Sequence, residues 1–301
     1  MKAREVQLAD GARHPWGALL LATGVAPIRL DIPGADLPHV HTLRSAGDCR
    51  ALIAGAQAAR RAVVLGASFI GLEVAASLRA RGLEIDVVAP EALPMEAVFG
   101  AEIGNLVRRV HQRHGVRFHL GATAAAIDGH GVTLNNGARL AADLVVVGIG
   151  VRPSTALAEA AGIAVDRGVM VDAYLQTNVP GIWAAGDIAR WPDRRSGETV
   201  RIEHWVVAER QGQTAARNML GRREQFDAVP FFWTQQHDLT LSYVGHARQW
   251  DRVEIEGSLD DRNAAVGYWR AGRKLAVLTI GRDRDSLAAE LELEQAIAAG
   301  A

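Results

Sequence analysis

Val63-Val64-Leu65-Gly66-Ala67-Ser68-Phe69-Ile70-Gly71-Leu72-Glu73 is the stretch that decides the fold. It reads as an apolar strand, a glycine turn and the start of a helix that ends before Gly82. Gly66 allows the tight turn, and Gly71 lets the helix pack closely against the strands. Ser68 stands where the dinucleotide fingerprint normally has its middle glycine, and serine is small enough to let a pyrophosphate approach. Because the pattern lies inside a strand–helix–strand unit, we predict a dinucleotide site and not tight packing alone.

The turn also predicts where a nucleotide would lie. Its phosphates would meet the helix N-terminus, where backbone N–H groups are unpaired and the helix dipole is positive. The acid that binds the ribose hydroxyls is expected about 20 residues on, at the end of the second strand. Ala89 holds that strand end, which leaves Glu91 for the role. No Lys or Arg occurs between Gly82 and Val107 to pair with a 2′-phosphate, so NADH is slightly favoured over NADPH.

An internal repeat surrounds this unit. Residues 6–27 read VQLADGARHPWGALLLATGVAP and residues 132–153 read VTLNNGARLAADLVVVGIGVRP, a constant offset of 126 with eight identities. Each copy predicts a strand, a tight turn and an apolar strand that ends in glycine. A complete strand–helix–strand unit precedes the second copy but not the first. If the copies are equivalent, we expect a matching unit upstream of Val6; chance similarity of two hairpins is the alternative.

The rest of the chain predicts further elements of an α/β protein. We expect a short helix over 157–162, strands near 169–171 and 181–185, and a helix over 206–220. The charged stretch 221–229 reads as a linker, and residues 231–281 alternate like several antiparallel strands. A last helix over 287–298 would have Asp285 or Ser286 as its N-cap.

Composition excludes several classes of function. The net charge of −1 and the lack of a sustained basic stripe argue against nucleic acid as a partner. We interpret the small clusters Arg190, Arg194, Arg195 and Arg222, Arg223 as solvated surface. No apolar run approaches the roughly 20 residues of a membrane span, and the first residues lack an apolar signal region, so we expect a cytoplasmic protein without a membrane partner.

Cysteine and histidine usage gives no sign of a metal or a redox thiol pair. Cys49 is the only cysteine, so the chain contains neither a disulfide framework nor a CxxC pair. His111, His114 and His119 lie on a helix and the following strand without carboxylate or cysteine companions, and we predict no metal site there. The pattern Gly66-Ala67-Ser68 lacks the second glycine of a nucleophile elbow.

Four motifs in order resemble the pyridine nucleotide-disulfide oxidoreductase superfamily, in the branch of ferredoxin reductases and apoptosis-inducing-factor-like flavoproteins. They are Ala22-Thr23-Gly24, the stretch Gly66 to Glu73, Gly148-Ile-Gly-Val-Arg-Pro153 and Thr177-Asn-Val-Pro-Gly-Ile-Trp-Ala-Ala-Gly-Asp187. The resemblance covers essentially the whole chain. It implies a two-dinucleotide-binding-domain flavoprotein fold with an incomplete FAD domain, plus a small C-terminal α+β domain. The implied domains are FAD-binding (1–42 and 149–226), NAD(P)-binding (43–148) and C-terminal (227–301).

The resemblance also implies which residues hold the cofactors FAD and NAD(P)H. Asp187 would hold the ribityl chain of FAD, the segment Glu203-His204-Trp205 would lie against the flavin ring, and Trp233 would face it. Glu73 would point to the meeting point of nicotinamide and flavin; otherwise it is a solvent-facing helical acid. Trp205 as an ordinary core residue is the other alternative. The full set of expected cofactor-binding residues is Thr23, Gly24, Gly66, Ser68, Phe69, Ile70, Gly71, Glu73, Glu91, Gly148, Gly186, Asp187, Glu203, His204, Trp205 and Trp233, and we assign no catalytic acid or base.

The activity implied by the resemblance is hydride transfer from NAD(P)H to flavin, followed by single-electron transfer to a ferredoxin or Rieske [2Fe-2S] protein. The alternatives are a disulfide reductase whose thiol pair lies upstream, and a non-enzymatic NAD(H)-binding redox sensor of the apoptosis-inducing-factor type. A homodimer is one option for the assembly. Because the repeat places the missing unit where FAD pyrophosphate would be held, we expect an intact nucleotide site beside an impaired flavin site, so that purified chain would not carry stoichiometric FAD.

Overall fold

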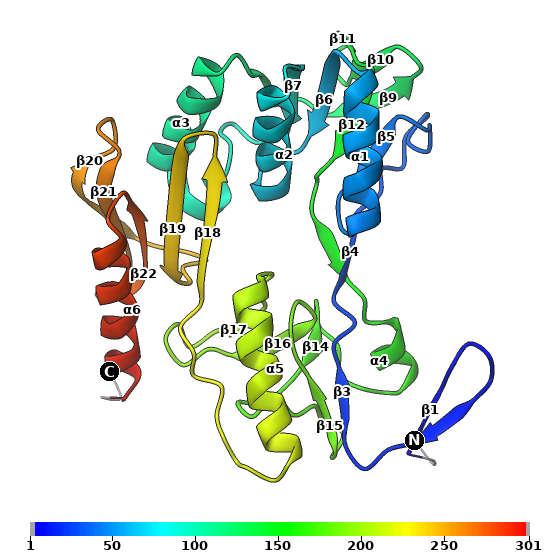
Figure 1. Cartoon of the computed structure of the whole chain (residues 1–301). Helices are drawn as coiled ribbons and strands as arrows, with labels where there is room; N and C mark the ends of the chain where they lie inside the picture. The colour runs from blue at the N-terminus through cyan, green and yellow to red at the C-terminus, as the bar shows by residue number, and fades with distance from the viewer. Residues whose placement is uncertain (1–3, 299–301) are drawn as a thin grey trace.

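The computed structural model describes residues 4–298 and is built around a five-stranded parallel sheet. We call this sheet and its three helices the parallel-sheet unit (Figure 1). The strand order is β5 (Val40–Thr42), β12 (Leu144–Val147), β6 (Arg61–Leu65), β7 (Glu84–Ala89) and β8 (Arg117–Leu120), and the helices are α1 (Ala46–Ala58), α2 (Phe69–Ala80) and α3 (Glu96–Arg113).

Strands β12 and β6 are almost entirely apolar and buried because both faces of the sheet are covered. Val64 and Val146 belong to the apolar cluster that also contains residues of α1, α2 and α3. Their neighbours Val63 and Val145 point to the opposite face, where they pack with Ile127 and other residues of a three-stranded sheet. That sheet has the order β11 (Arg139–Ala141), β10 (Gly131–Leu134) and β9 (Ala124–Asp128).

The internal repeat is confirmed as a repeat of structure. In the first copy the strands are β1 (Glu5–Gln7), β2 (Arg13–Pro15), β3 (Leu19–Leu21) and β4 (Val25–Pro27). In the second copy β10, β11, β12 and β13 (Val151–Pro153) follow at the same offset. Both turns use the same hydrogen bond, in which the side chain of Asp10 or Asn136 accepts from the backbone N–H two residues on. The strands β4 and β13 pair with each other antiparallel, so the two copies meet directly.

The small-sheet unit lies below the parallel-sheet unit in Figure 1. Its strands are β3 with β15 (Ile182–Ala184), which pair parallel, and the order β14 (Val169–Met170), β16 (Ala189–Pro192) and β17 (Thr199–Val200). Its helices are α4 (Ala156–Ala160) and α5 (Trp205–Met219). Trp191 is fully buried in its core and packs edge-on against Phe226 from the linker after α5.

The antiparallel unit follows that linker, as the alternation in the sequence predicts. It contains a five-stranded sheet with α6 (Asp283–Ala298) packed on it. The strand order is β18 (Phe231–Gln236), β19 (Leu239–Gly245), β22 (Arg273–Ile280), β21 (Asn263–Arg270) and β20 (Arg252–Ser258). Buried residues of this sheet join the same apolar cluster as α2 and α3, and the hydroxyl of Tyr268 donates to the Phe99 carbonyl at 2.9 Å.

Two expectations are wrong. The last helix begins at Asp283, so neither Asp285 nor Ser286 is its N-cap; both lie in the first turn, where Arg282 pairs with Asp285 at 2.5 Å.

Arg190 and Arg195 are not solvated surface either. Arg195 pairs at 2.7 Å with Asp193 and is 7% exposed, and the side chain of Arg190 is nearly buried by its pairing with Asp166. An acid close in the fold allows each guanidinium to be buried.

No helix in residues 4–298 is both long enough and apolar enough to span a membrane. Cys49 is exposed on α1.

Three histidines meet between α3 and the turn from β18 to β19. The buried ring of His111 contacts His237 edge-on at 4.7 Å, and His237 stacks on His114 at 4.0 Å. Burial is the main reason why the pKa values of His111 and His237 fall from 6.5 to about 4. Within the described residues, no group of three His, Cys, Asp or Glu side chains is arranged to hold a metal ion.

We expect alanine at Gly71 to destabilise the protein by about 2–3 kcal/mol, because its Cβ would lie 2.2 Å from the carbonyl oxygen of Gly66. Thermal unfolding would measure the change. Alanine at Gly212, in α5, is the control: a Cβ there meets nothing within 4 Å, and helix propensity favours alanine over glycine. Equal melting temperatures for the two variants would contradict the close approach at Gly71.

Stability should fall as the pH drops from 6.5 towards 4. His111 is neutral in the fold, whereas in the unfolded chain it binds a proton below pH 6.5, so protonation favours unfolding in this range. The lowered pKa of His111 alone corresponds to about 2 kcal/mol lost at pH 5 relative to pH 8. Urea unfolding at both pH values measures it. Between pH 8 and pH 5, the free energy of unfolding of His111→Gln should fall by about 2 kcal/mol less than that of the wild type. Equal falls in the variant and the wild type would show that His111 is not the group responsible.

Candidate functional site

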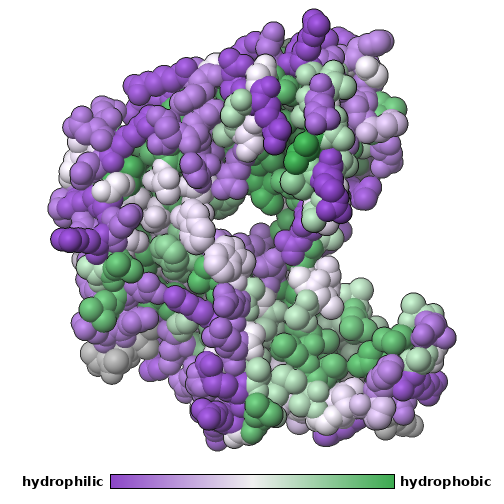
Figure 2. Space-filling model, in the orientation of Figure 1, coloured by the Kyte–Doolittle hydropathy of each residue, from purple (hydrophilic) through white to green (hydrophobic). Residues whose placement is uncertain are grey.

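A cleft of about 1000 Å³ lies where the three units meet. In Figure 2 the molecule is hollowed between its upper and lower parts. The N-terminal turn of α2 comes from the parallel-sheet unit, the ends of β3 and β15 and the start of α5 come from the small-sheet unit, and β18 comes from the antiparallel unit. The volume is at the upper end of the range for small-molecule and cofactor sites.

Most of the residues that the sequence predicts for the site line this cleft, although they are far apart in the chain. They are Gly24, Phe69, Ile70, Glu73, Gly186, Asp187, Glu203, His204, Trp205 and Trp233. Thr23, Gly66, Ser68, Gly71, Glu91 and Gly148 do not line it.

Gly66, Gly71 and Gly148, which do not line the cleft, pack against one another beneath the turn between β6 and α2. A Cβ on Gly66 would lie 2.2 Å from the carbonyl oxygen of Gly148, and one on Gly71 would lie 2.2 Å from the carbonyl oxygen of Gly66. Gly66 also has φ +110°, which favours glycine. The glycines therefore bring α2 against the ends of β6 and β12, and this contact turns Phe69 and Ile70 into the cleft.

The other three residues outside the lining, Ser68, Glu91 and Thr23, are all exposed. Ser68 is the exposed N-cap of α2, and its hydroxyl makes no capping hydrogen bond, so the first N–H groups of the helix lack a side-chain partner. Glu91 is exposed just beyond β7, on the same edge of the sheet. The hydroxyl of Thr23 donates to the Ser154 carbonyl at 2.7 Å, which joins the two copies of the repeat.

Asp187 is held by an arginine that the sequence did not indicate. Arg44 Nη2 donates to Asp187 Oδ2 at 3.2 Å, and the same guanidinium lies close to Gly24. Arg44 lies two residues after β5, at the carboxyl end of the parallel sheet. Ligands of α/β proteins bind at this end of the strands, so the position of Arg44 is the signal that could have identified it.

Aromatic side chains form one wall. Trp205 and Trp233 are 58% and 44% exposed, and their rings meet edge-on at 5.8 Å. His204 lies between them and Phe232, which also lines the cleft. The interpretation of Trp205 as core is therefore wrong. His204 Nδ1 accepts the N–H of Val206 and caps α5, and burial lowers the pKa of His204.

Glu73 is not a solvent-facing helical acid. Its carboxylate lines the cleft, and Oε1 accepts a hydrogen bond from the hydroxyl of Thr234 at 2.5 Å. Thr234 belongs to β18, so this bond joins α2 to the antiparallel unit.

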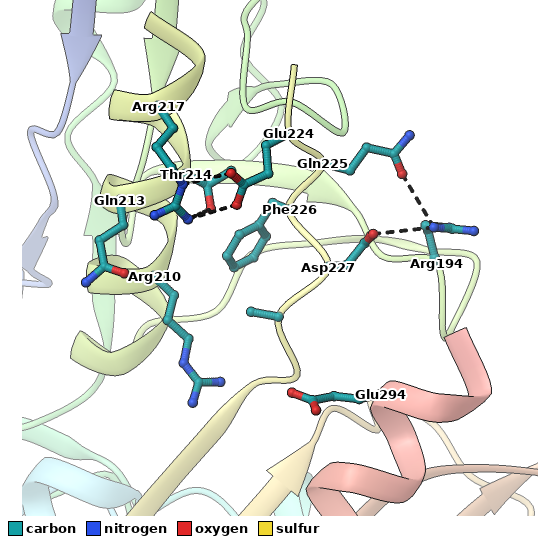
Figure 3. A pocket seen from close by; sticks show the side chains of 11 residues that line it. Arg194, Arg210, Gln213, Thr214, Arg217, Glu224, Gln225, Phe226, Asp227 and Glu294 are labelled. Atoms are coloured by element: carbon teal, nitrogen blue, oxygen red, sulfur yellow. Dashed lines mark hydrogen bonds and ion pairs between the residues drawn. The ribbon is translucent and has the colours of Figure 1, made fainter. Parts of the chain in front are cut away.

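A second cavity, of about 540 Å³, lies between α5, the linker and α6 (Figure 3). Three arginines line it, but each is already paired with an acid. Arg217 binds Glu224 through two nitrogens at 2.7 and 2.8 Å, Arg210 binds Glu290 at 3.0 Å and Arg194 lies 3.4 Å from Asp227. Glu294 adds a further negative charge to the wall. This cavity is therefore less suited to a phosphate than the N-terminus of α2.

Comparisons with known proteins agree with the geometry. The sequence profile described as pyridine nucleotide-disulphide oxidoreductase matches residues 1–212, and the profile described as reductase C-terminal matches residues 231–301. Rhodocoxin reductase of Rhodococcus erythropolis is 37% identical over 292 residues, which cover 95% of this chain and 68% of that protein. Apoptosis-inducing factor 3 of Mus musculus is 33% identical over 94% of this chain, which spans only 48% of the relative's length.

A solved structure shows the same fold. The ferredoxin reductase for the CYP199A2 system from Rhodopseudomonas palustris superposes with a TM-score of 0.92 at 37% identity, covering 95% of this chain and 72% of the other. The likeness extends over the cleft and all three units.

Proposed function

The chain belongs to the pyridine nucleotide-disulphide oxidoreductase family, and we propose that it passes electrons from NAD(P)H through a flavin to a ferredoxin or a Rieske-type [2Fe-2S] protein. The observation that best supports this is the cleft itself. The first turn of α2, which follows the glycine turn, the Gly186-Asp187 turn and an aromatic wall all line one cavity. That arrangement would bring a nicotinamide and a flavin ring together.

We assign the pyridine nucleotide to the turn between β6 and α2. Its phosphates would face the N–H groups at the start of α2, where the small side chain of Ser68 leaves them accessible. Glu91, exposed at the end of β7, would accept hydrogen bonds from the ribose hydroxyls. A carboxylate there would repel a 2′-phosphate, which supports NADH over NADPH.

The residues of the aromatic wall fit the ring and ribityl end of a flavin. Trp205 and Trp233 are exposed and line the cleft together with Asp187, so their apolar faces are available to a flat aromatic ring. Gly186 has φ +81°, a backbone conformation that favours glycine in the turn before Asp187. When bound, a flavin supplies the ability to take two electrons as hydride and release them singly.

The chain's own residues bind and orient. Asp187 would accept hydrogen bonds from ribityl hydroxyls, and the tryptophans would fix the plane of the ring and exclude water. No side chain in the cleft is needed as an acid or base. The single cysteine, Cys49, lies on α1 and does not line the cleft, so the described residues offer no support for disulfide reduction.

Under anaerobic stopped-flow mixing with added FAD, we expect NADH to bleach the flavin rapidly and a [2Fe-2S] ferredoxin to be reduced in turn. A Rieske protein serves as the second acceptor. Slow bleaching with a long-lived charge-transfer band would instead support a redox sensor, and absence of any flavin reduction would overturn the proposal.

Glu91→Ala should raise the KM for NADH about tenfold and leave kcat nearly unchanged, because the ribose contact is remote from the reacting atoms. Steady-state NADH oxidation with an artificial acceptor measures both. The matched control is Glu84→Ala, which removes an acid from the opposite end of the same strand, where it contacts Arg117 at 3.4 Å. An unchanged KM in the Glu91 variant would remove Glu91 from the site.

A further inference from the structure

A chain of three hydrogen bonds runs from the cleft wall into the protein. Glu73 Oε1 accepts from Thr234 Oγ1 at 2.5 Å, Thr234 Oγ1 accepts from Gln236 Nε2 at 2.8 Å, and Gln236 Oε1 lies 3.0 Å from His111 Nε2. Thr234, Gln236 and His111 are essentially inaccessible to solvent. The chain joins α2, β18 and α3, so it spans the contact between the parallel-sheet unit and the antiparallel unit.

In each of these three hydrogen bonds, the donor is the residue on the side away from Glu73. In the 2.5 Å contact the hydroxyl of Thr234 donates its hydrogen to Glu73 Oε1. A threonine hydroxyl has one hydrogen, so its contact with Gln236 must be accepted from the amide nitrogen. The amide oxygen of Gln236 then faces His111, which must donate from Nε2.

The burial of His111 is consistent with this direction. Loss of hydration lowers the pKa of His111 to about 4, so the ring is neutral near pH 7 and carries one hydrogen. That hydrogen is on Nε2, and Nδ1 is buried without a partner among the described residues. The tautomer, the amide orientation and the threonine rotamer are therefore determined together.

Resting on the proposed function, we infer that Thr234 is a positioning residue for nicotinamide recognition. Its hydroxyl, fixed by Gln236 and His111, holds one oxygen of Glu73 and leaves the other free to accept a hydrogen bond from the carboxamide of the nicotinamide. A glutamate without such a partner samples several rotamers and loses side-chain entropy when it is ordered. Thr234 orders it before the ligand arrives.

Thr234→Val tests this, because valine keeps the shape and removes the hydroxyl. We expect NADH to bind the purified chain about tenfold more weakly, measured by NADH fluorescence at equilibrium. Thr234→Ser retains the hydroxyl and should restore binding to within twofold of wild type. Thr279→Val is the matched control, since Thr279 is also buried in the antiparallel sheet but makes no side-chain hydrogen bond to Glu73.

A double-mutant cycle with Glu73→Ala separates positioning from a purely structural role. If Thr234 acts through Glu73, the loss of affinity caused by Thr234→Val should disappear in the Glu73→Ala background. Urea unfolding of the same variants records any loss of stability separately. Wild-type affinity in Thr234→Val, or an equal loss in both backgrounds, would overturn this inference alone. A wild-type chain that fails to bind NADH would overturn the proposed function and this inference with it.

Discussion

The close contact between the start of α2 and the ends of β6 and β12 is the constraint on which the site depends. Gly66, Gly71 and Gly148 pack so closely that a methyl group on Gly66 or Gly71 would overlap a backbone carbonyl. This contact directs the first turn of α2 towards the cleft and carries Phe69, Ile70 and Glu73 with it. The glycines that define the dinucleotide fingerprint thus act as packing residues, and Phe69, Ile70 and Glu73 line the cleft.

Strand β18 forms the wall of the cleft opposite α2, and its side chains are divided between the cleft and the contact with α2 and α3. Trp233 is exposed to the cleft, whereas Thr234 and Gln236 are buried against α2 and α3. Buried polar side chains are tolerated on this strand because each one is paired across the interface. The edge-on contact of Phe69 with Phe232 at 5.3 Å adds an apolar contact beside that polar chain. The position of Glu73 therefore depends on how two units pack together as well as on its own helix.

Local patterns predicted much of this architecture, and long-range pairs account for what they missed. The repeat at an offset of 126 predicts which segments are equivalent, and all four strands of one copy recur in the other. Thr234 and Gln236 are polar, so the sequence alone would suggest that they are exposed. Their partners, Glu73 and His111, lie more than 100 residues away in the chain. The sequence suggests an exposed Arg195 for a related reason: the linker carbonyls of Asp227 and Ala228, which accept from its guanidinium, lie far away in the sequence. Arg282, the residue before α6, likewise pairs with Glu256 of β20 as well as with Asp285.

The pair formed by Arg44 and Asp187 shows how the cleft can be both ordered and open to a ligand. Asp187 is mostly buried, whereas Arg44 is nearly half exposed, and an ion pair with such access to water contributes only about 0–1 kcal/mol. The pair is therefore strong enough to orient the carboxylate and weak enough for hydroxyl groups of a ligand to share it at little cost. Arg201 donates to the backbone carbonyl of Asp187 at 2.9 Å and holds the turn from its other side. The carboxylate thus keeps its position while one of its partners can change.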